Sequence, residues 1–334
     1  MSQRSDSDSS RSQALLGNAI SRSSASPAAP GTTPDVDLQR PNENSSLGLF
    51  YGLAAYTYWG LQPLYFKYIK TVPAAALVAH RTISCAVFLL IFITVLRRWP
   101  AFWKCVSSKR LLALLTASAL LLAGNWLIYI ASVLNNQLVE TSLGYFINPL
   151  FSVCLGVVFF RERPGPLQTA AIFLAAIGIG YLVVSLAIVP WMALGLAGCW
   201  GLYGLVRKVA AVESLTGLTV ETMILAVPAA GYLAWESNRG HDIYGGLATG
   251  GKSLVMVSGL VTAIPLLWFG AAARRLPLST LGFLQFIAPS LQLLLAVRGY
   301  GETFTGHHAV TFGFIWAGLA LFTAESIFRR GARA

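Results

Sequence analysis

The sequence predicts an all-α integral membrane protein with ten transmembrane helices arranged as two inverted five-helix repeats. Of the 334 residues, 55% are hydrophobic and 11% are charged, and the mean hydropathy is +0.64. Soluble globular proteins do not have such a composition. Apolar segments of membrane-spanning length follow one another through the chain, and motifs of the first half recur in the second. These three observations predict the fold class.

Ten apolar segments each hold roughly 20 residues, enough to cross about 30 Å of hydrocarbon at about 1.5 Å per residue. Residues 1–46 precede them and are rich in Ser, Pro, Asn and Asp without an apolar run, so we expect a disordered cytoplasmic tail there. The connecting loops are short except near residues 97–110 and 236–252. The expected spans are residues 48–66, 73–96, 111–134, 138–160, 167–187, 189–206, 214–235, 253–273, 278–297 and 309–328.

Lys and Arg residues are divided unequally between the two sides of this arrangement. Of the 24 basic residues, 18 lie on the side of both termini, five lie on the other side, and Arg81 falls inside the second span. The positive-inside rule therefore predicts cytoplasmic termini, including a basic tail at residues 329–334. The net charge of +11 then reflects topology, so we expect a lipid bilayer as partner and no nucleic acid.

An internal repeat divides the membrane region at a spacing of 140 to 141 residues. Trp59-Gly60-Leu61 recurs at residues 200–202, and Phe146-Ile147-Asn148-Pro149 recurs as Phe286-Ile287-Ala288-Pro289. We expect a first repeat at residues 47–187 and a second at 188–328. Because five spans is an odd number, the second repeat must enter the membrane from the opposite side. Inverted repeats are typical of secondary transporters with a site near the midplane.

The sequence contains no enzyme motif in the structural context that its chemistry requires. Residues 246–253 match the pattern GxxxxGK[ST], but a nucleotide-binding loop follows a strand and needs an acidic residue for magnesium, and this segment lies in an expected external loop. No span contains an aspartate, and the four cysteines are scattered singly. We therefore expect no enzyme activity, no cofactor and no metal site.

Ionisable residues inside the spans are the first candidates for a functional site, because they are costly in lipid. His80 and Arg81 lie in the second span and Glu221 in the seventh, and His80 and Glu221 are equivalent at the repeat offset of 141. Both positions fall within about 5 Å of the midplane. One interpretation is that Glu221, with His80, binds and releases a coupling proton. In the other, Arg81 neutralises a carboxylate and His80 bonds a neighbouring helix.

Amide and phenol side chains in the spans are the second set of candidates, either as substrate contacts or as interhelical hydrogen bonds. They are Gln62, Asn125, Tyr145, Asn148, Gln285 and Gln292. Four prolines are expected to kink their helices and to free backbone carbonyls, which a cavity or a neighbouring helix must then satisfy. These are Pro63, Pro149, Pro265 and Pro289.

Two further features have structural interpretations. Glu162 and Glu302 end the fourth and ninth spans, where the helix dipole disfavours a carboxylate, so we expect each to bind the N-terminus of the next helix. The pairs Ala176/Gly180 and Gly313/Ala317 in the fifth and tenth spans predict close helix packing or a homodimer.

Several strings together resemble the RarD proteins, EamA-type permeases of the drug/metabolite transporter superfamily. They include Ala79-His80-Arg81, the run from Ser142 to Leu150, and the run from Ala273 to Gln285. The resemblance extends from Leu47 to Phe328. It implies a bacterial inner-membrane protein of two EamA repeats that moves small organic solutes without ATP, with the fifth and tenth spans as scaffold or dimer surface.

These observations together predict an alternating-access carrier that exports a small metabolite or drug in a proton-coupled manner. The alternatives are an uptake permease of the same fold and a non-transporting membrane sensor or scaffold that presents the N-terminal tail to a partner.

Overall fold

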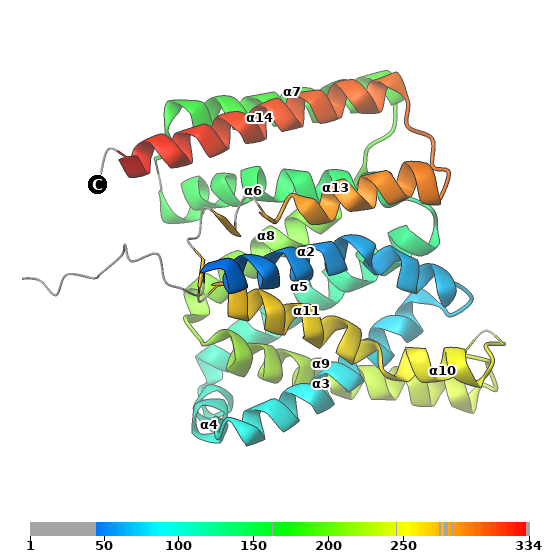
Figure 1. Cartoon of the computed structure of the whole chain (residues 1–334). Helices are drawn as coiled ribbons and strands as arrows, with labels where there is room; N and C mark the ends of the chain where they lie inside the picture. Colours follow the sequence, from blue (N-terminus) through cyan, green and yellow to red (C-terminus); the bar gives the residue numbers. More distant parts are fainter. Residues whose placement is uncertain are drawn as a thin grey trace, which may run out of the picture. The chain divides into compact units, whose positions relative to one another are not determined.

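A computed structural model describes residues 45–331, apart from residues 162, 245, 274, 277–279 and 282–283. The side chains of residues 45, 273 and 326–331 are also left out. The expected tail at residues 1–46 therefore lies almost wholly outside the described residues, as do residues 332–334. Within the described part, every regular element is helical (Figure 1). The backbone of the last helix continues to Gly331, three residues beyond the expected end of the tenth span.

Helix lies in each of the ten expected segments. Most expected spans are single helices: α2 (Ser45–Tyr68), α3 (Ala74–Val95), α5 (Lys109–Leu134), α6 (Leu138–Phe160), α7 (Pro166–Leu186), α8 (Trp191–Ala210), α9 (Ser214–Asn238) and α14 (Gly306–Gly331). The eighth is a pair, α10 (Thr249–Met256) and α11 (Ser258–Ala273), bent by 44°. The ninth contains α13 (Ile287–Leu294) and the π-helix η1 (Leu295–Gly299).

Six of the described helices are long and apolar enough to cross a membrane, or seven if the bent pair is one span. They are α3, α5, α6, α7, α9 and α14, with α10 and α11 as the pair. Helices α2 and α8 have spanning length, at 24 and 20 residues, but their aromatic, glycine and basic residues lower the mean hydropathy. The chain is a multi-pass membrane protein, and the count of ten spans stays a prediction.

The helix contacts have the form that a duplication would produce. Helix α2 packs against α11 and α13, and its counterpart α8 packs against α5 and α6. Helix α3 packs against α11, and its counterpart α9 packs against α5. The pairs α3–α9, α6–α13 and α7–α14 join each helix to its own counterpart. This exchange supports two repeats, while their boundaries at residues 187 and 188 stay a prediction.

Helices α7 and α14 lie side by side (Figure 1) because glycines let their backbones approach. A Cβ atom at Gly178 would lie 2.9 Å from the Cβ of Phe314, and one at Gly318 would lie 2.9 Å from the carbonyl oxygen of Ala171. The Thr311 hydroxyl also donates to the Gly178 carbonyl at 3.2 Å. The small residues that pack these helices within one chain are therefore glycines outside the two expected pairs.

The two expected small-residue pairs lie on open faces of these helices. Ala176, Gly180, Gly313 and Ala317 are all exposed, and a Cβ atom at Gly180 or Gly313 would have no atom of the described residues within 4 Å. These faces are therefore available for a second copy, and the homodimer stays a prediction.

The two long loops contain helices that the sequence analysis did not separate. Residues Trp99–Ser107 form α4, with Phe102 buried and Trp103 exposed. In the other loop, the Asp242 carboxylate accepts the backbone N–H of Tyr244 at 3.0 Å and of Gly246 at 2.6 Å. The segment that matched the nucleotide-binding pattern therefore forms a turn and the start of α10.

Candidate functional site

Glu221 is fully buried on α9, where side chains of two other helices donate to its carboxylate. The Ser118 hydroxyl on α5 donates at 2.5 Å, and the Tyr203 hydroxyl on α8 donates at 3.2 Å. Arg207 on α8 forms an ion pair at 3.3 Å. Both carboxylate oxygens are therefore satisfied, and the ion-pair partner of Glu221 is Arg207, in place of Arg81.

The local sequence around α8 and α9 explains this position of Arg207. Tyr203 and Arg207 are four residues apart, so they share one face of α8. The other end of the guanidinium donates to the carbonyls of Val212 and Glu213 at 3.3 and 3.4 Å, just beyond the end of α8. Gly217 on α9 leaves the space that the guanidinium occupies. Sequence reasoning assigned Arg207 to the basic side of the membrane and missed its role as a partner of Glu221.

Arg81 lies inside the bundle on α3 and is 6% exposed. Its Nε and Nη1 atoms are buried without a hydrogen-bond partner, and no carboxylate of the described residues lies within 4 Å of it. The guanidinium lies over the ring of Trp126 on α5, 4.6 Å from the centroid. A cation–π contact contributes about 0.5–2 kcal/mol, whereas burying an unpaired ion costs several kcal/mol.

Phenol side chains from three helices influence this charge electrostatically. Tyr65 on α2, Tyr129 on α5 and Tyr145 on α6 are all close enough to Arg81 to interact with it electrostatically. The Tyr129 hydroxyl is itself buried without a hydrogen-bond partner. Neutral phenols solvate a cation but do not neutralise it, so Arg81 keeps its full charge in this environment.

Four other predicted site residues also have buried polar atoms without partners, namely Nε2 of Gln62, Nε2 of His80, Oδ1 of Asn148 and Oε1 of Gln292. Gln62 and Tyr65 are three residues apart on α2, so they lie on the same face of that helix. Tyr145 and Asn148 are likewise three residues apart and share a face of α6. The His80 ring lies 5.5 Å from the ring of Tyr244. The predicted residues Gln62, Arg81, Tyr145 and Asn148 thus face one interior region.

Other predicted candidates join helices to one another. Asn125 donates from Nδ2 to the Leu196 carbonyl on α8 at 3.3 Å. Of the two interpretations of this residue, substrate contact and interhelical hydrogen bond, this bond agrees with the second. Gln285 lies half-buried in the turn before α13.

The prolines behave partly as expected. Pro63 lacks the N–H that would bond the Trp59 carbonyl within α2, and Gln292 Nε2 on α13 donates to that carbonyl at 3.2 Å. Pro149 and Pro265 lie inside α6 and α11. Pro289 lies in the first turn of α13, where its missing N–H breaks no helical bond.

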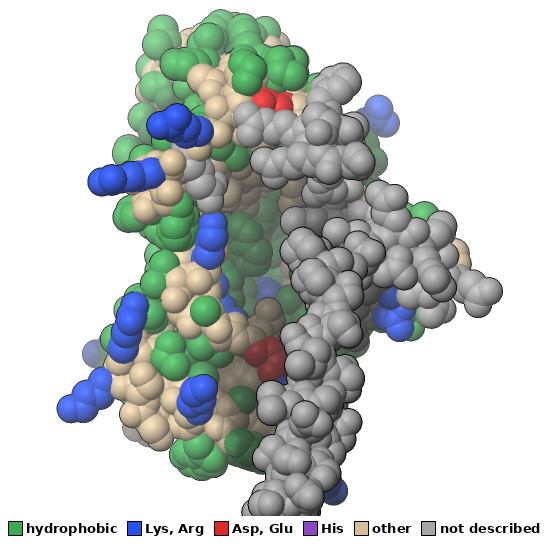
Figure 2. Space-filling view, turned by 90° about the vertical axis from the view of Figure 1, so that its left-hand side faces the viewer, with side chains coloured by type: hydrophobic (Ala, Val, Ile, Leu, Met, Phe, Trp, Pro, Cys, Tyr) green, Lys and Arg blue, Asp and Glu red, His purple; other side chains and the backbone are tan. Residues whose placement is uncertain are grey.

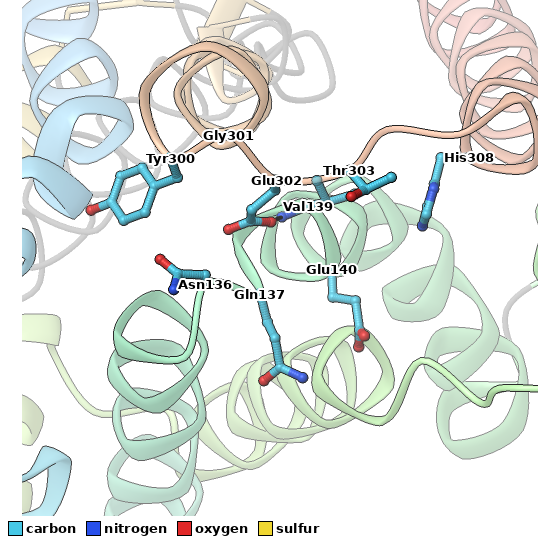
Figure 3. Close-up of a pocket in the computed structure, with 9 residues that line it drawn as sticks. All are labelled: Asn136, Gln137, Val139, Glu140, Tyr300, Gly301, Glu302, Thr303 and His308. Carbon is cyan, nitrogen blue, oxygen red and sulfur yellow. Dashed lines mark hydrogen bonds between the residues drawn. The ribbon is translucent and has the colours of Figure 1, made fainter.

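A pocket of about 410 Å³ lies beside the turn between α5 and α6 and the segment after η1 (Figure 3). The Glu302 carboxylate accepts the N–H groups of Leu138 and Val139 at 2.6 and 2.7 Å. A helix N-terminus therefore compensates Glu302 as expected, but that helix is α6 rather than the next helix, α14. Glu162 lies outside the described residues.

Tyr300 lines the same pocket and connects it to α2. Burial, together with the neighbouring Glu302 carboxylate, raises the pKa of Tyr300 to about 12. The phenol therefore stays protonated at neutral pH and donates to the Pro63 carbonyl at 2.6 Å. None of the predicted site residues lines this pocket.

One end of the bundle is strongly basic (Figure 2). Lys and Arg side chains gather there around a hollowed centre, and hydrophobic side chains lie within the hollow. Exposed basic residues at this end come from the ends of α3, α5 and α6 and from α4. They include Arg97, Arg98, Lys104, Lys109, Arg110 and Arg161. This is the end that the positive-inside rule assigns to the cytoplasm.

Comparison with known proteins identifies similar transporters. The EamA-like transporter family matches residues 46–184. An "Uncharacterized transporter" of Vibrio cholerae is 43% identical over 88% of this chain and 96% of its own length. "Protein RarD" of Escherichia coli is 42% identical over 84% of this chain and 95% of its own. "Uncharacterized transporter YojE" of Bacillus subtilis is 40% identical over 84% of this chain and 94% of its own.

A solved structure also resembles the chain, with a TM-score of 0.50 and 19% identity, covering 83% of this chain and 97% of the other. Its title is "Crystal structure of protein". At this identity the likeness concerns the fold alone.

Proposed function

This chain belongs to the RarD-type EamA-like transporters, and from that premise we propose that it is an alternating-access carrier that exports a small organic metabolite or drug in exchange for protons. We place it in the bacterial inner membrane with both termini in the cytoplasm. The observation that carries the proposal is the exchange of helix contacts between α2, α3, α11 and their counterparts α8, α9, α5. Two such halves can rock against each other around a central site.

Glu221 is the residue that couples protons to this motion in our proposal. Its bonds to Ser118 and Arg207 join α9 to α5 and to α8. A proton on Glu221 removes the charge that attracts Arg207, which weakens the contact between α8 and α9. Proton uptake at this position therefore favours separation of these helices, and proton release favours their closure.

Untargeted metabolite profiling of cells and medium tests the proposal. Cells that express the protein are compared with cells carrying an empty vector and with cells expressing Glu221→Gln. Glu213→Gln, which changes an acid with a half-exposed side chain, is the matched control. We expect a compound that accumulates in the medium with the intact protein and with Glu213→Gln, and that is lost with Glu221→Gln.

The other outcomes each exclude part of the proposal. Accumulation inside the cells would reverse the direction and make the protein an uptake permease. No difference from the vector, with the protein shown to be folded in the membrane, would contradict metabolite export.

We also propose that a homodimer forms through the open faces of α7 and α14. Gly180→Cys and Gly313→Cys variants should then cross-link between copies in membranes, because no described residue covers these positions. Gly198→Cys on α8, at another uncovered position, should not cross-link.

A further inference from the structure

We infer that the transported solute is an organic anion whose carboxylate pairs with Arg81 in the interior of the bundle. The inference rests on the proposed transport function, because it names the substrate class of that carrier. It goes beyond the family name, which states no substrate charge.

Buried Arg81 and partly buried Arg207 have opposite surroundings. Arg207 pairs with Glu221 at 3.3 Å, so its charge is neutralised within the protein. Arg81 is more deeply buried, and two of its nitrogen atoms donate to nothing. An arginine stays protonated at any physiological pH, so loss of a proton does not relieve the free-energy cost of burying the unpaired charge of Arg81.

The carboxylates of the described residues are engaged elsewhere. Glu221 binds Arg207, Glu213 binds Arg98 and Glu236 binds His241. Glu302 accepts the N–H groups that begin α6, and Asp242 accepts two N–H groups of its own loop. Glu325 accepts the N–H of Gln168 at 2.6 Å, and Glu140 accepts the backbone N–H of Met192. No carboxylate of the described residues therefore pairs with Arg81, and we assign that role to a bound solute.

The groups around Arg81 indicate the chemistry of that solute. A guanidinium matches the planar geometry of a carboxylate and binds it through charge-assisted hydrogen bonds. The unpartnered Tyr129 hydroxyl and Gln62 Nε2 are further donors on neighbouring helices. The Trp126 ring, which lies 4.6 Å from the guanidinium, provides flat apolar surface. A single carboxylate on an apolar or aromatic body fits this set of groups.

Matched pairs of ligands test the inference on the purified full-length protein in detergent. The pairs are benzoate with benzamide, phenylacetate with phenylacetamide, and hexanoate with hexanamide, and phenyl phosphate is added as a second oxyanion. Thermal unfolding is followed by tryptophan fluorescence. We expect at least one carboxylate to raise the midpoint by roughly 2–5 °C near saturation, while its amide leaves the midpoint unchanged.

Variants then assign the effect to one side chain. Arg81→Gln should abolish the shift, Arg81→Lys should retain part of it because an ammonium keeps the charge but not the planar geometry, and Arg98→Gln should retain all of it. The inference is overturned if amides shift the midpoint as much as carboxylates, if Arg81→Gln keeps the shift, or if no carboxylate shifts the wild-type protein. A shift with phenyl phosphate alone would replace the carboxylate by a phosphate ester.

Failure of this inference is separable from failure of the transport proposal. If metabolite profiling finds an exported compound but neutral ligands bind better than carboxylates, the export proposal is supported and the organic-anion inference is contradicted. If carboxylates bind through Arg81 but no compound changes its distribution in cells, the binding site is supported and the export proposal is contradicted.

Discussion

Two places that are equivalent in the predicted repeats differ in how their buried polar groups are bonded. In the second repeat, Glu221 accepts bonds from Ser118, Tyr203 and Arg207. In the first repeat, His80 stands at the position of Glu221 and Gln62 at that of Tyr203, and each has a buried nitrogen without a partner. Phe66 replaces Arg207. The counterpart of the Glu221 network is therefore open, and the unpaired Arg81 follows directly on His80.

If the repeats are a duplication, the difference indicates that the two halves have separate roles. A network whose donors and acceptors are all paired holds α5, α8 and α9 together and must be broken by a proton or by motion. A set of unpaired donors on α2, α3 and α5 has no such stabilising role within the protein and is suited to a solute. Buried polar groups without partners are costly, so their retention points to binding rather than to stability.

The largest expected effect is that of Arg207→Gln. This variant leaves the Glu221 carboxylate buried and without its ion pair, which should cost roughly 3–5 kcal/mol of stability. The thermal midpoint of the purified protein measures the loss. The double variant Arg207→Gln/Glu221→Gln should recover most of it, because the uncompensated charge is removed. A midpoint of the single variant equal to that of wild type would show that the paired network does not hold the helices.

Ser118→Ala is expected to have the next effect. The Ser118 hydroxyl donates to a charged acceptor at 2.5 Å, and a hydrogen bond to a charged group contributes about 1.5–3 kcal/mol. Tyr203→Phe removes a longer bond of 3.2 Å and should lower the midpoint less. Equal effects, or a larger one for Tyr203→Phe, would contradict the order that the distances predict.

A third test concerns the contact between Arg81 and Trp126. In a double-mutant cycle with Arg81→Gln and Trp126→Leu, we expect a coupling of about 0.5–2 kcal/mol, the range for a cation–π contact. The cycle separates this contact from the packing that Trp126→Leu also removes. Additive effects on the unfolding midpoint would mean that the ring does not stabilise the guanidinium.

The positions of the helices could be predicted from the sequence because apolar runs and turns are local signals. The fourth expected span, residues 138–160, has the bounds of α6. Two features of the helices could not be predicted. Helix α4 lies in a loop and is too short to give a clear periodic signal. The ninth expected span changes to a π-helix at Leu295. Nothing in the residue pattern around Leu295 signals that change.

Partners could not be predicted, because they depend on which face each helix turns to its neighbours. Pro63 predicts an open carbonyl four residues earlier, but not that the donor to the Trp59 carbonyl is Gln292, which is 233 residues away. Glu221 was recognised as a site candidate, whereas Arg207 looked like a loop charge. Its pairing depends on how α8 packs beside α9, and sequence spacing alone does not contain that information.

Arg81→Gln should have the smallest effect on stability, and its sign completes the comparison. Removing a paired arginine such as Arg207 destabilises the protein, because its carboxylate partner stays buried without an ion pair. Removing Arg81 leaves no carboxylate unpaired; it loses the Trp126 contact but also relieves the cost of an uncompensated buried charge. We therefore expect an unfolding midpoint equal to or above that of wild type without ligand, in contrast to the large loss in Arg207→Gln. A large loss in Arg81→Gln would mean that Arg81 is a structural residue like Arg207, and the distinction between the two repeats would fail.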